Sequence, residues 1–382
     1  MATGNDQVSS LADKLERVST SKSKLYTEEK VVGKGIGCIA MKEIKKGSLV
    51  LREAPQLLCP DVGIRTFEES FRYIEVVIKT FLDMSKEDQE SYFNLYNKFD
   101  DDKTTWSDGM KQHSINLVHL ISQMTFPNIS HETAFKVMGI KETNGFHNGV
   151  CLKMSRFNHS CRPNAQYFWN VDRNTRDVRT LRKIKEGEEI TLSYIPTTMG
   201  SREERRTELK DIFNFGCNCE ACDLTEAEIE RETKTIDEYK EEKRKKMEFK
   251  DAAKLASDVT TVQALMQSES KCLKNMYQLG KEIKTLSRRV LLHDIVEEAF
   301  DVSAQGAVSV MYSQFLNLRN MEAAKATWLK DAKMFADIGL GIAKTLNGED
   351  HSITKEWIAR SADPVKFFLM EFRGAVKHVA MA

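Results

Sequence analysis

Short apolar runs interrupted by glycine form the first stretch of the chain that predicts ordered structure. Between Val31 and Leu58 the glycines lie at positions 33, 35, 37 and 47, a pattern that predicts short strands joined by turns. From Thr66 to about Met138 the apolar residues instead recur at helical spacing. The clearest example is one predicted helix face formed by Phe71, Ile74, Val77, Ile78 and Phe81. A helical insertion therefore follows the first group of strands.

Strand signals return between Asn144 and Tyr194, where glycine, asparagine and β-branched residues are frequent. The segment from Ile184 to Ile190 has the pattern of a strand, a turn and a second strand. After Pro196 there is no proline until Pro364, and good helix formers dominate between them. No heptad register persists there, so we expect stacked helices and no single long coil. The sequence predicts an α+β protein whose β part is split around helices.

Composition narrows the class of protein. The chain has 382 residues, 41% of them hydrophobic, which is enough for a large core without disulfides. Lys and Arg together number 57, as do Asp and Glu, so net charge draws the chain to neither nucleic acid nor an anionic membrane. Residues 1–24 are polar and lack an apolar signal segment. We expect an intracellular protein, in the nucleus and/or the cytoplasm, with no direct nucleic-acid or membrane partner and a preference for the monomer.

Cysteine spacing points to a metal. Cys217, Cys219 and Cys222 lie within six residues, and in a reducing compartment such a group favours metal over disulfides. With Cys161 they make four thiols that one tetrahedral Zn²⁺ could take. A site closed by four thiolates has no open position for water, so we expect a structural role. The other four cysteines stand singly and are expected to be buried free thiols: Cys38, Cys59, Cys151 and Cys272.

Four motifs together resemble the SET-domain lysine methyltransferases, in particular the SET-and-MYND branch. They are the glycine loop at 33–37, the run Arg156 to Asn164 containing Asn158-His159-Ser160-Cys161, the segment Glu189 to Tyr194, and the cysteine cluster with its lead-in Ser201 to Arg206. The family's MYND zinc finger is missing, because residues 60–140 contain no cysteine. We expect a helical cap over the substrate groove in its place.

The resemblance implies a domain plan. It is a polar tail at 1–25, the N-terminal SET part at 26–60, the helical insertion at 61–140, the C-terminal SET part at 141–200, a zinc-bound post-SET segment at 201–224 and a helical domain at 225–382. Short curled β-sheets with a pseudoknot would form the SET part, with the segment ending at Tyr194 threaded past Asn158 and His159.

The resemblance also implies an activity and a site. The activity is S-adenosylmethionine-dependent methylation of a lysine in a histone or non-histone protein. Tyr194 would be the catalytic residue, orienting the lysine amine. By the same resemblance, S-adenosylmethionine would contact Lys34, Gly35, Gly37, Asn144, Asn158, His159, Tyr194 and Phe215, while Phe146 and Phe213 would line the lysine channel. Relatives often carry tyrosine at the position of Phe213, so we hypothesise that this enzyme adds more than one methyl group.

A second hypothesis from a different class stays open at this point. The chain could be a non-catalytic SET scaffold that binds partner proteins through its helical half. Methylation of a small-molecule amine by the same site is a third. Two further features predict no function. The run Lys240 to Lys250, interleaved with glutamates, is expected to be a solvated helix face. His113 and His119 are expected to be ordinary helix residues, in the core or at the surface.

Overall fold

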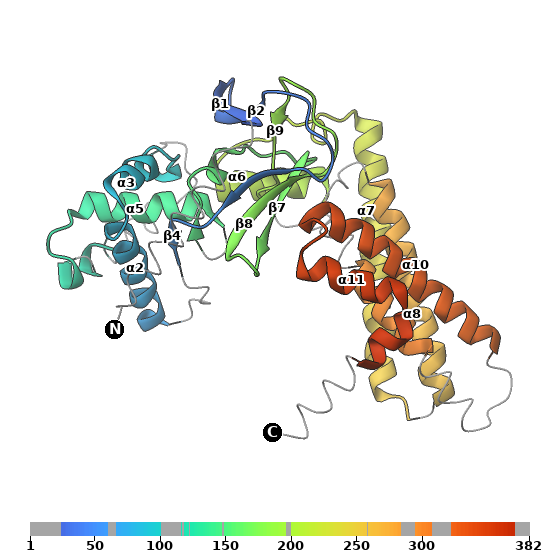
Figure 1. Ribbon diagram of the computed structural model, residues 1–382. Helices are drawn as coiled ribbons and strands as arrows, with labels where there is room; N and C mark the ends of the chain where they lie inside the picture. Colours follow the sequence, from blue (N-terminus) through green and yellow to red (C-terminus); the bar gives the residue numbers. More distant parts are fainter. Residues whose placement is uncertain are drawn as a thin grey trace, which may run out of the picture.

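The computed structural model describes residues 24–59, 66–100, 116, 118–121, 123–146, 149–195, 200–257, 259–283, 295–307 and 322–370. The polar tail expected at 1–25 lies almost wholly outside these ranges, as does His113. Within them the order of elements is short strands, a helical insertion, more short strands and then helices. The α+β class expected from the sequence is confirmed, with a helical C-terminal part (Figure 1).

In the described ranges the β part consists of three small antiparallel sheets, and each joins strands from before the insertion to strands after it. The first is a hairpin of β1 (Tyr26–Val31) and β2 (Gly35–Ala40), extended by β9 (Glu189–Ile190). The second has the order β3 (Leu49–Glu53), β8 (Thr175–Thr180), β7 (Ala165–Asn170). The third has the order β4 (Leu57–Leu58), β6 (Gly149–Val150), β5 (Gly145–Phe146). The two parts of the chain therefore fold as one unit.

The turn of the first hairpin depends on glycine. Gly33 and Gly35 have φ angles of 74° and 76°, which residues with a side chain rarely adopt. The strand, turn and strand predicted from Ile184 to Ile190 are present in short form: Ile184 makes a single antiparallel bridge to Ile44, Gly187 lies in the turn with a φ angle of 76°, and β9 begins at Glu189. The two ends pair with separate partners, Ile44 and β2.

The described insertion contains helices α2 (Phe67–Leu82), α3 (Lys86–Phe93) and α5 (His131–Asn144), the 3₁₀ turn η1 (Lys98–Asp100), and the helical residues 116, 118–121 and 123–125. Thr66 begins α2 with a capping box that it shares with Glu69. The face predicted from periodicity is the buried one, since Val77, Ile78 and Phe81 are 2% exposed or less. The helical character of α2 follows from that apolar stripe.

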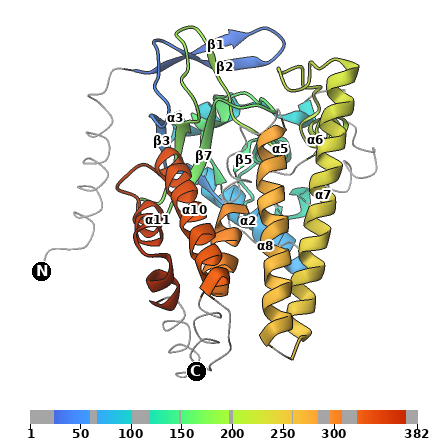
Figure 2. The same cartoon turned by 90° about the vertical axis from the view of Figure 1, so that its right-hand side faces the viewer.

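A second helical group follows the β part. Its described part comprises α6 (Arg202–Phe213), α7 (Glu226–Leu255), α8 (Val259–Glu282), helical residues 295–307, α10 (Glu322–Asn347), α11 (Ser352–Ala362) and helical residues 364–370. Phe300, Phe335 and Trp357 belong to its apolar core. The turn between α10 and α11 docks on the β7–β8 hairpin, where the ring of His351 meets Phe168 and the amide of Ser352 donates to Asp172. Figure 2 shows α10 beside β7 and α7 beside α8.

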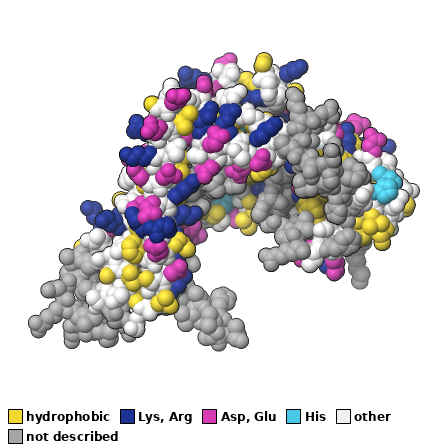
Figure 3. All heavy atoms as spheres, turned by 180° about the vertical axis from the view of Figure 1, so that it is seen from behind, with side chains coloured by type: hydrophobic (Ala, Val, Ile, Leu, Met, Phe, Trp, Pro, Cys, Tyr) yellow, Lys and Arg dark blue, Asp and Glu magenta, His cyan; other side chains and the backbone are white. Residues whose placement is uncertain are grey.

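The overall shape is an arch. In Figure 1 the insertion lies at one end, the long helices at the other, and the sheets between them. Seen from behind, basic and acidic side chains intermix over the face above the long helices (Figure 3). Among the described residues, helices long and apolar enough to cross a membrane are absent.

Candidate active site and four-cysteine cluster

Two segments far apart in sequence lie side by side at the centre of the site. His159 forms a parallel bridge with Leu192. The amide of Ser160 donates to the carbonyl of Leu192, and the amide of Leu192 donates to the carbonyl of Asn158, both at 2.9 Å. Asn164 locks the pairing, since its Oδ1 accepts from the Thr191 amide at 2.9 Å. This pairing brings Asn158 and His159 next to the segment that ends at Tyr194.

Tyr194 is held at both its backbone and its hydroxyl. Its amide donates to His159 Nδ1 at 3.0 Å, and its hydroxyl donates to the carbonyl of Phe157 at 2.8 Å. Burial, followed by the nearby Glu189 carboxylate, raises the pKa of Tyr194 well above its ordinary value. The group is therefore a neutral hydroxyl at physiological pH.

The tautomer of His159 follows from these contacts. Nδ1 accepts a backbone hydrogen bond, so the ring proton belongs on Nε2. Nε2 lies 3.2 Å from Cys161 Sγ and donates to that sulfur. The imidazole therefore links Tyr194 on one side to the cysteine cluster on the other.

Aromatic rings surround Tyr194. Its ring centroid lies 5.1 Å from that of Phe213 and 6.3 Å from that of Phe215, and Phe215 also lies 5.9 Å from His159. The structure thus brings together the predicted catalytic tyrosine and two predicted aromatics. Phe146 makes a ring contact with Tyr167, at 5.0 Å between centroids, and its place in the lysine channel stays a prediction.

The glycine loop reaches the same site through Gly37. A Cβ atom at Gly37 would lie 2.7 Å from Asn158 Nδ2 and 2.8 Å from Glu189 Oε1, so no larger residue fits without a shift. Lys34 Nζ also donates to Glu189, through Oε2, at 2.7 Å. Glu189 was within the motif quoted from the sequence but was not assigned a role there.

Asn144 is placed differently from the other predicted contacts. It ends α5, and its amide nitrogen donates to the carbonyls of Tyr96 and Ile140 at 2.7 and 2.8 Å. Both N–H groups are thereby used, and only Oδ1 stays available as an acceptor. The insertion holds this side chain, which limits any ligand contact of Asn144 to ligand donors.

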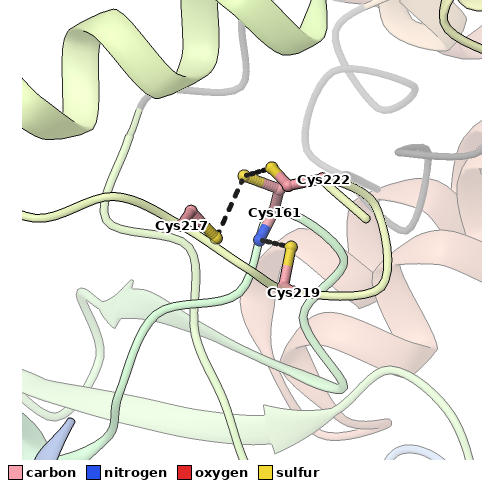
Figure 4. A group of neighbouring side chains, drawn as sticks. All are labelled: Cys161, Cys217, Cys219 and Cys222. Carbon is pink, nitrogen blue, oxygen red and sulfur yellow. Dashed lines mark hydrogen bonds between the residues drawn. The ribbon is translucent and has the colours of Figure 1, made fainter. Parts of the chain in front are cut away.

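The four predicted metal ligands converge. All four sulfurs lie within 4.8 Å of one another, and Figure 4 shows Cys161 meeting the loop that carries the other three. Cys161 Sγ lies 3.9 Å from the sulfur of Cys217 and 3.5 Å from that of Cys222. Four thiolates about 2.3 Å from a tetrahedral Zn²⁺ would be about 3.8 Å apart. The donor set and its spacing therefore fit a structural zinc ion.

Three arginines of α6 hold the cysteine loop by its backbone carbonyls. Arg202 Nε donates to the carbonyl of Cys222 at 2.6 Å, and Arg206 donates to that of Cys217 at 2.8 Å. Arg205, 1% exposed, donates to the carbonyl of Ala221 at 2.8 Å and pairs with Glu232 of α7 at 3.2 Å. These arginine-to-carbonyl hydrogen bonds were not predicted from the sequence, although the motif from Ser201 to Arg206 contains all three arginines.

Comparison with known families bears directly on this arrangement. The family model described as "SET domain" matches residues 35–195. Residues 35–195 form a SET domain. Its matched range contains Gly35, Gly37, Asn144, Phe146, Asn158, His159, Cys161 and Tyr194. The other candidate site residues lie outside this range: Lys34, Phe213, Phe215, Cys217, Cys219 and Cys222. The candidate site therefore combines the SET domain with the segments that flank it.

Two curated proteins similar to this chain are named as histone-lysine N-methyltransferases. The chain is 29% identical over 209 residues to the histone-lysine N-methyltransferase set5 of Schizosaccharomyces pombe, covering 55% of this chain and 54% of that protein. It is 28% identical over 225 residues to the histone-lysine N-methyltransferase SMYD3 of Mus musculus, covering 55% and 51%. The chain thus spans about half the length of these curated relatives. The recognition of the SET-and-MYND likeness from motifs is confirmed.

A solved structure offers a more distant comparison. The crystal structure of the SET domain of LSMT bound to lysine and AdoHcy aligns over 90% of this chain and 94% of that one, with a TM-score of 0.38 and 12% identity. A likeness this distant carries no argument about the site.

Proposed function

We propose that this chain is an S-adenosylmethionine-dependent protein-lysine N-methyltransferase. The observation that carries the proposal is the parallel pairing of Asn158 to Ser160 with the segment ending at Tyr194. It places the half-buried Tyr194 among the aromatic rings of His159, Phe213 and Phe215. The SET domain and relatives named as histone-lysine N-methyltransferases support the same activity and a protein substrate.

The residues on the glycine side suit the amino-acid end of the cofactor. Gly35 is exposed and has open space where a Cβ would lie. Glu189 accepts one N–H from Lys34 Nζ and one from Asn158 Nδ2. Lys34 therefore keeps two N–H donors and Asn158 keeps one. Carboxylates bind most strongly to charged donors of this kind. We therefore assign Lys34, Gly35, Gly37, Asn158 and His159 to the cofactor, with Phe215 against its adenine.

When bound, S-adenosylmethionine supplies a methyl group on a positively charged sulfur. The protein must align the lysine nitrogen with that methyl and present the amine without its proton. Tyr194 is not the base, because its raised pKa keeps the hydroxyl protonated. Desolvation between apolar rings lowers the lysine pKa from about 10.4, and the proton leaves to water. The Tyr194 oxygen then orients the amine lone pair while the rings exclude water.

The zinc ion expected at the four cysteines would act through structure. It would fix Cys161, two residues after His159, to the loop that follows Phe213 and Phe215. The aromatic wall would then keep its place against Tyr194. No chemical step at the lysine requires the metal.

Replacing Tyr194 by phenylalanine tests the activity. We expect calorimetric S-adenosylmethionine binding to stay within about threefold of the wild type, while methyl release on whole-cell protein extract falls by about 10²-fold, as on losing one preorganised hydroxyl. Tyr92→Phe is the control, because the Tyr92 hydroxyl, in the buried core of the insertion, also donates to a carbonyl, that of Val137, at 2.8 Å. The control should lose only about 1 kcal/mol of stability.

Two outcomes would count against the proposal. A zinc-loaded, folded protein that fails to bind S-adenosylmethionine favours the non-catalytic scaffold. Equal loss of turnover in the Tyr92 and Tyr194 variants assigns the effect to folding. Intact mass of the product tests the role given to Phe213: monomethyl-lysine alone would contradict the addition of further methyl groups.

A further inference from the structure

The Glu189 carboxylate joins two side chains from separate parts of the site. Its Oε2 accepts from Lys34 Nζ at 2.7 Å, and its Oε1 accepts from Asn158 Nδ2 at 2.8 Å. Lys34 comes from the turn before β2, Asn158 from the segment after η2 (Met154–Arg156), and Glu189 from β9. One carboxylate thus fixes the distance between the glycine loop and the Asn158-His159 segment.

The backbone is arranged to bring these groups together. Glu189 lies opposite Ile39 in the β2–β9 pairing, and its own carbonyl accepts from Asn164 Nδ2 at 2.8 Å. Gly37 leaves the space in which Asn158 and Glu189 meet, since a Cβ would come within 2.8 Å of both. The contact is therefore built by three segments and is not an incidental surface ion pair.

The ion pair with Glu189 restricts the side-chain motion of Lys34 before any ligand binds. Its side chain is 44% exposed, whereas that of Glu189 is 17% exposed. A long exposed lysine that is free to rotate loses conformational entropy when a ligand immobilises it. An ammonium held by Glu189 has already lost that freedom and keeps two N–H donors. Asn158 is oriented by the same carboxylate and keeps one.

We propose that Glu189 is a positioning residue of the cofactor site, which holds Lys34 and Asn158 in place for the carboxylate end of S-adenosylmethionine. The inference rests on the proposed function. Glu189 acts through its two partners and does not touch the transferred methyl group. Its removal should therefore weaken cofactor binding while leaving the rate at saturating cofactor nearly unchanged.

The test compares Glu189→Gln with Glu186→Gln, an exposed carboxylate three residues earlier. We expect Glu189→Gln to weaken calorimetric binding of S-adenosylmethionine by about tenfold, the scale of one charge-assisted hydrogen bond, with kcat changed by less than about threefold. Glu186→Gln should bind as the wild type does. Gly37→Ala should weaken binding in the same direction, because the added Cβ separates Asn158 from Glu189.

Two further measurements identify the route of the effect. S-adenosylhomocysteine lacks the sulfonium charge, so positioning predicts equal weakening for both ligands, whereas direct attraction to the sulfonium predicts a loss for S-adenosylmethionine alone. In a Lys34→Met background, the added cost of Glu189→Gln should fall to about threefold, because contacting residues are not additive.

The outcomes separate the two proposals. A wild-type protein that does not bind S-adenosylmethionine overturns the proposed function. A wild type that binds, together with a Glu189→Gln variant of unchanged affinity and unchanged melting, overturns only the role of Glu189. A loss confined to S-adenosylmethionine, or a fall in kcat with affinity intact, overturns positioning as well.

Discussion

The region around Tyr194 and the helical half of the chain are held together in different ways. Around Tyr194 the contacts are polar and specific: Leu192 pairs with the backbone of Asn158 and Ser160, and the arginines of α6 hold the carbonyls of the cysteine loop. The helical half is held together by an apolar core of residues from α8, α10, α11 and helix 295–307. One region fixes positions and the other mainly excludes water.

The difference has a practical consequence. Hydrogen bonds need a particular donor at a particular distance, so the loss of one partner leaves a buried group unsatisfied. Apolar packing tolerates exchange of side chains when the volume is kept. Changes near Tyr194 should therefore impair cofactor binding, while changes in the helical half should alter stability and leave the site intact.

Metal removal should show the largest separation of the two regions. A structural zinc ion contributes on the order of 10 kcal/mol to small domains that fold around it. Stripping it with a chelator should abolish S-adenosylmethionine binding, because Phe213 and Phe215 adjoin the ligands, while hydrogen exchange in α8 and α10 stays slow. Cys272→Ser is the control variant, because Cys272 is a buried cysteine far from the cluster in sequence. It should respond to the chelator as the wild type does. Full binding by zinc-free protein, checked by metal analysis, would refute the structural role.

Breaking the buried ion pair between α6 and α7 should come next. Arg205 and Glu232 have side chains 1% and 3% exposed, and removal of one partner leaves the other charge buried. We expect Arg205→Met to lower the free energy of unfolding by about 3–5 kcal/mol, measured by urea denaturation, and to loosen the cysteine loop. The matched control is Arg244→Met, since Arg244 pairs with Glu241 and Glu248 on an exposed face and should show no measurable change. Equal effects at both positions would contradict the distinction.

The same contrast explains what the sequence could reveal. Cys217, Cys219 and Cys222 were identifiable as candidate metal ligands, because a metal site requires fixed residue types and these three lie at close spacing. Asn158, His159 and Tyr194 lay in motifs for a similar reason. The stripe from Ile74 to Phe81 predicted a helix because burial imposes a period. Chemistry and burial both leave a pattern within one segment.

Contacts between distant segments left no such pattern. The proposed role of Glu189 depends on the β2–β9 register, and the double use of the Asn144 amide depends on the packing of α5 beside Tyr96. The separate partners of Ile184 and Glu189 were missed because a local turn signal does not specify which strand each side pairs with. Side-chain partners of this kind are set by topology.

Two glycines of α10 test packing in the helical half. A Cβ at Gly339 would lie 2.2 Å from the ring of Trp357, whereas nothing lies within 4 Å of the Cβ position at Gly341. Gly339→Ala should therefore lower the free energy of unfolding by about 1–3 kcal/mol through overpacking. Gly341→Ala should raise it by about 1 kcal/mol, because alanine is the better helix former. Both should bind S-adenosylmethionine normally; a binding defect in either would show that the helical half shapes the cofactor site.

His351 provides the smallest effect, at the junction of the two regions. Its Nδ1 accepts from the Ile353 amide at 3.1 Å and so caps α11. Burial lowers the pKa of His351 below its ordinary value, which the carboxylates of Asp172 and Asp177 oppose and Arg179 and Arg52 reinforce. The folded state thus favours the neutral ring. Its contribution is complete above the unfolded pKa of about 6.5 and is lost as pH falls through the folded value.

The expected size of that loss is about 1 kcal/mol, the usual worth of a helix cap. Urea midpoints of the wild type and His351→Asn should therefore diverge as pH falls from about 7.5 to about 5.5. Asparagine also caps helices but does not titrate, so the variant lacks this dependence while other groups titrate equally in both proteins. Parallel midpoints would show that protonation of His351 does not weaken the α11 cap. Because His351 contacts Phe168 of β7, a pH-dependent loss of methyl transfer confined to the wild type would place the docking of α11 among the determinants of the site.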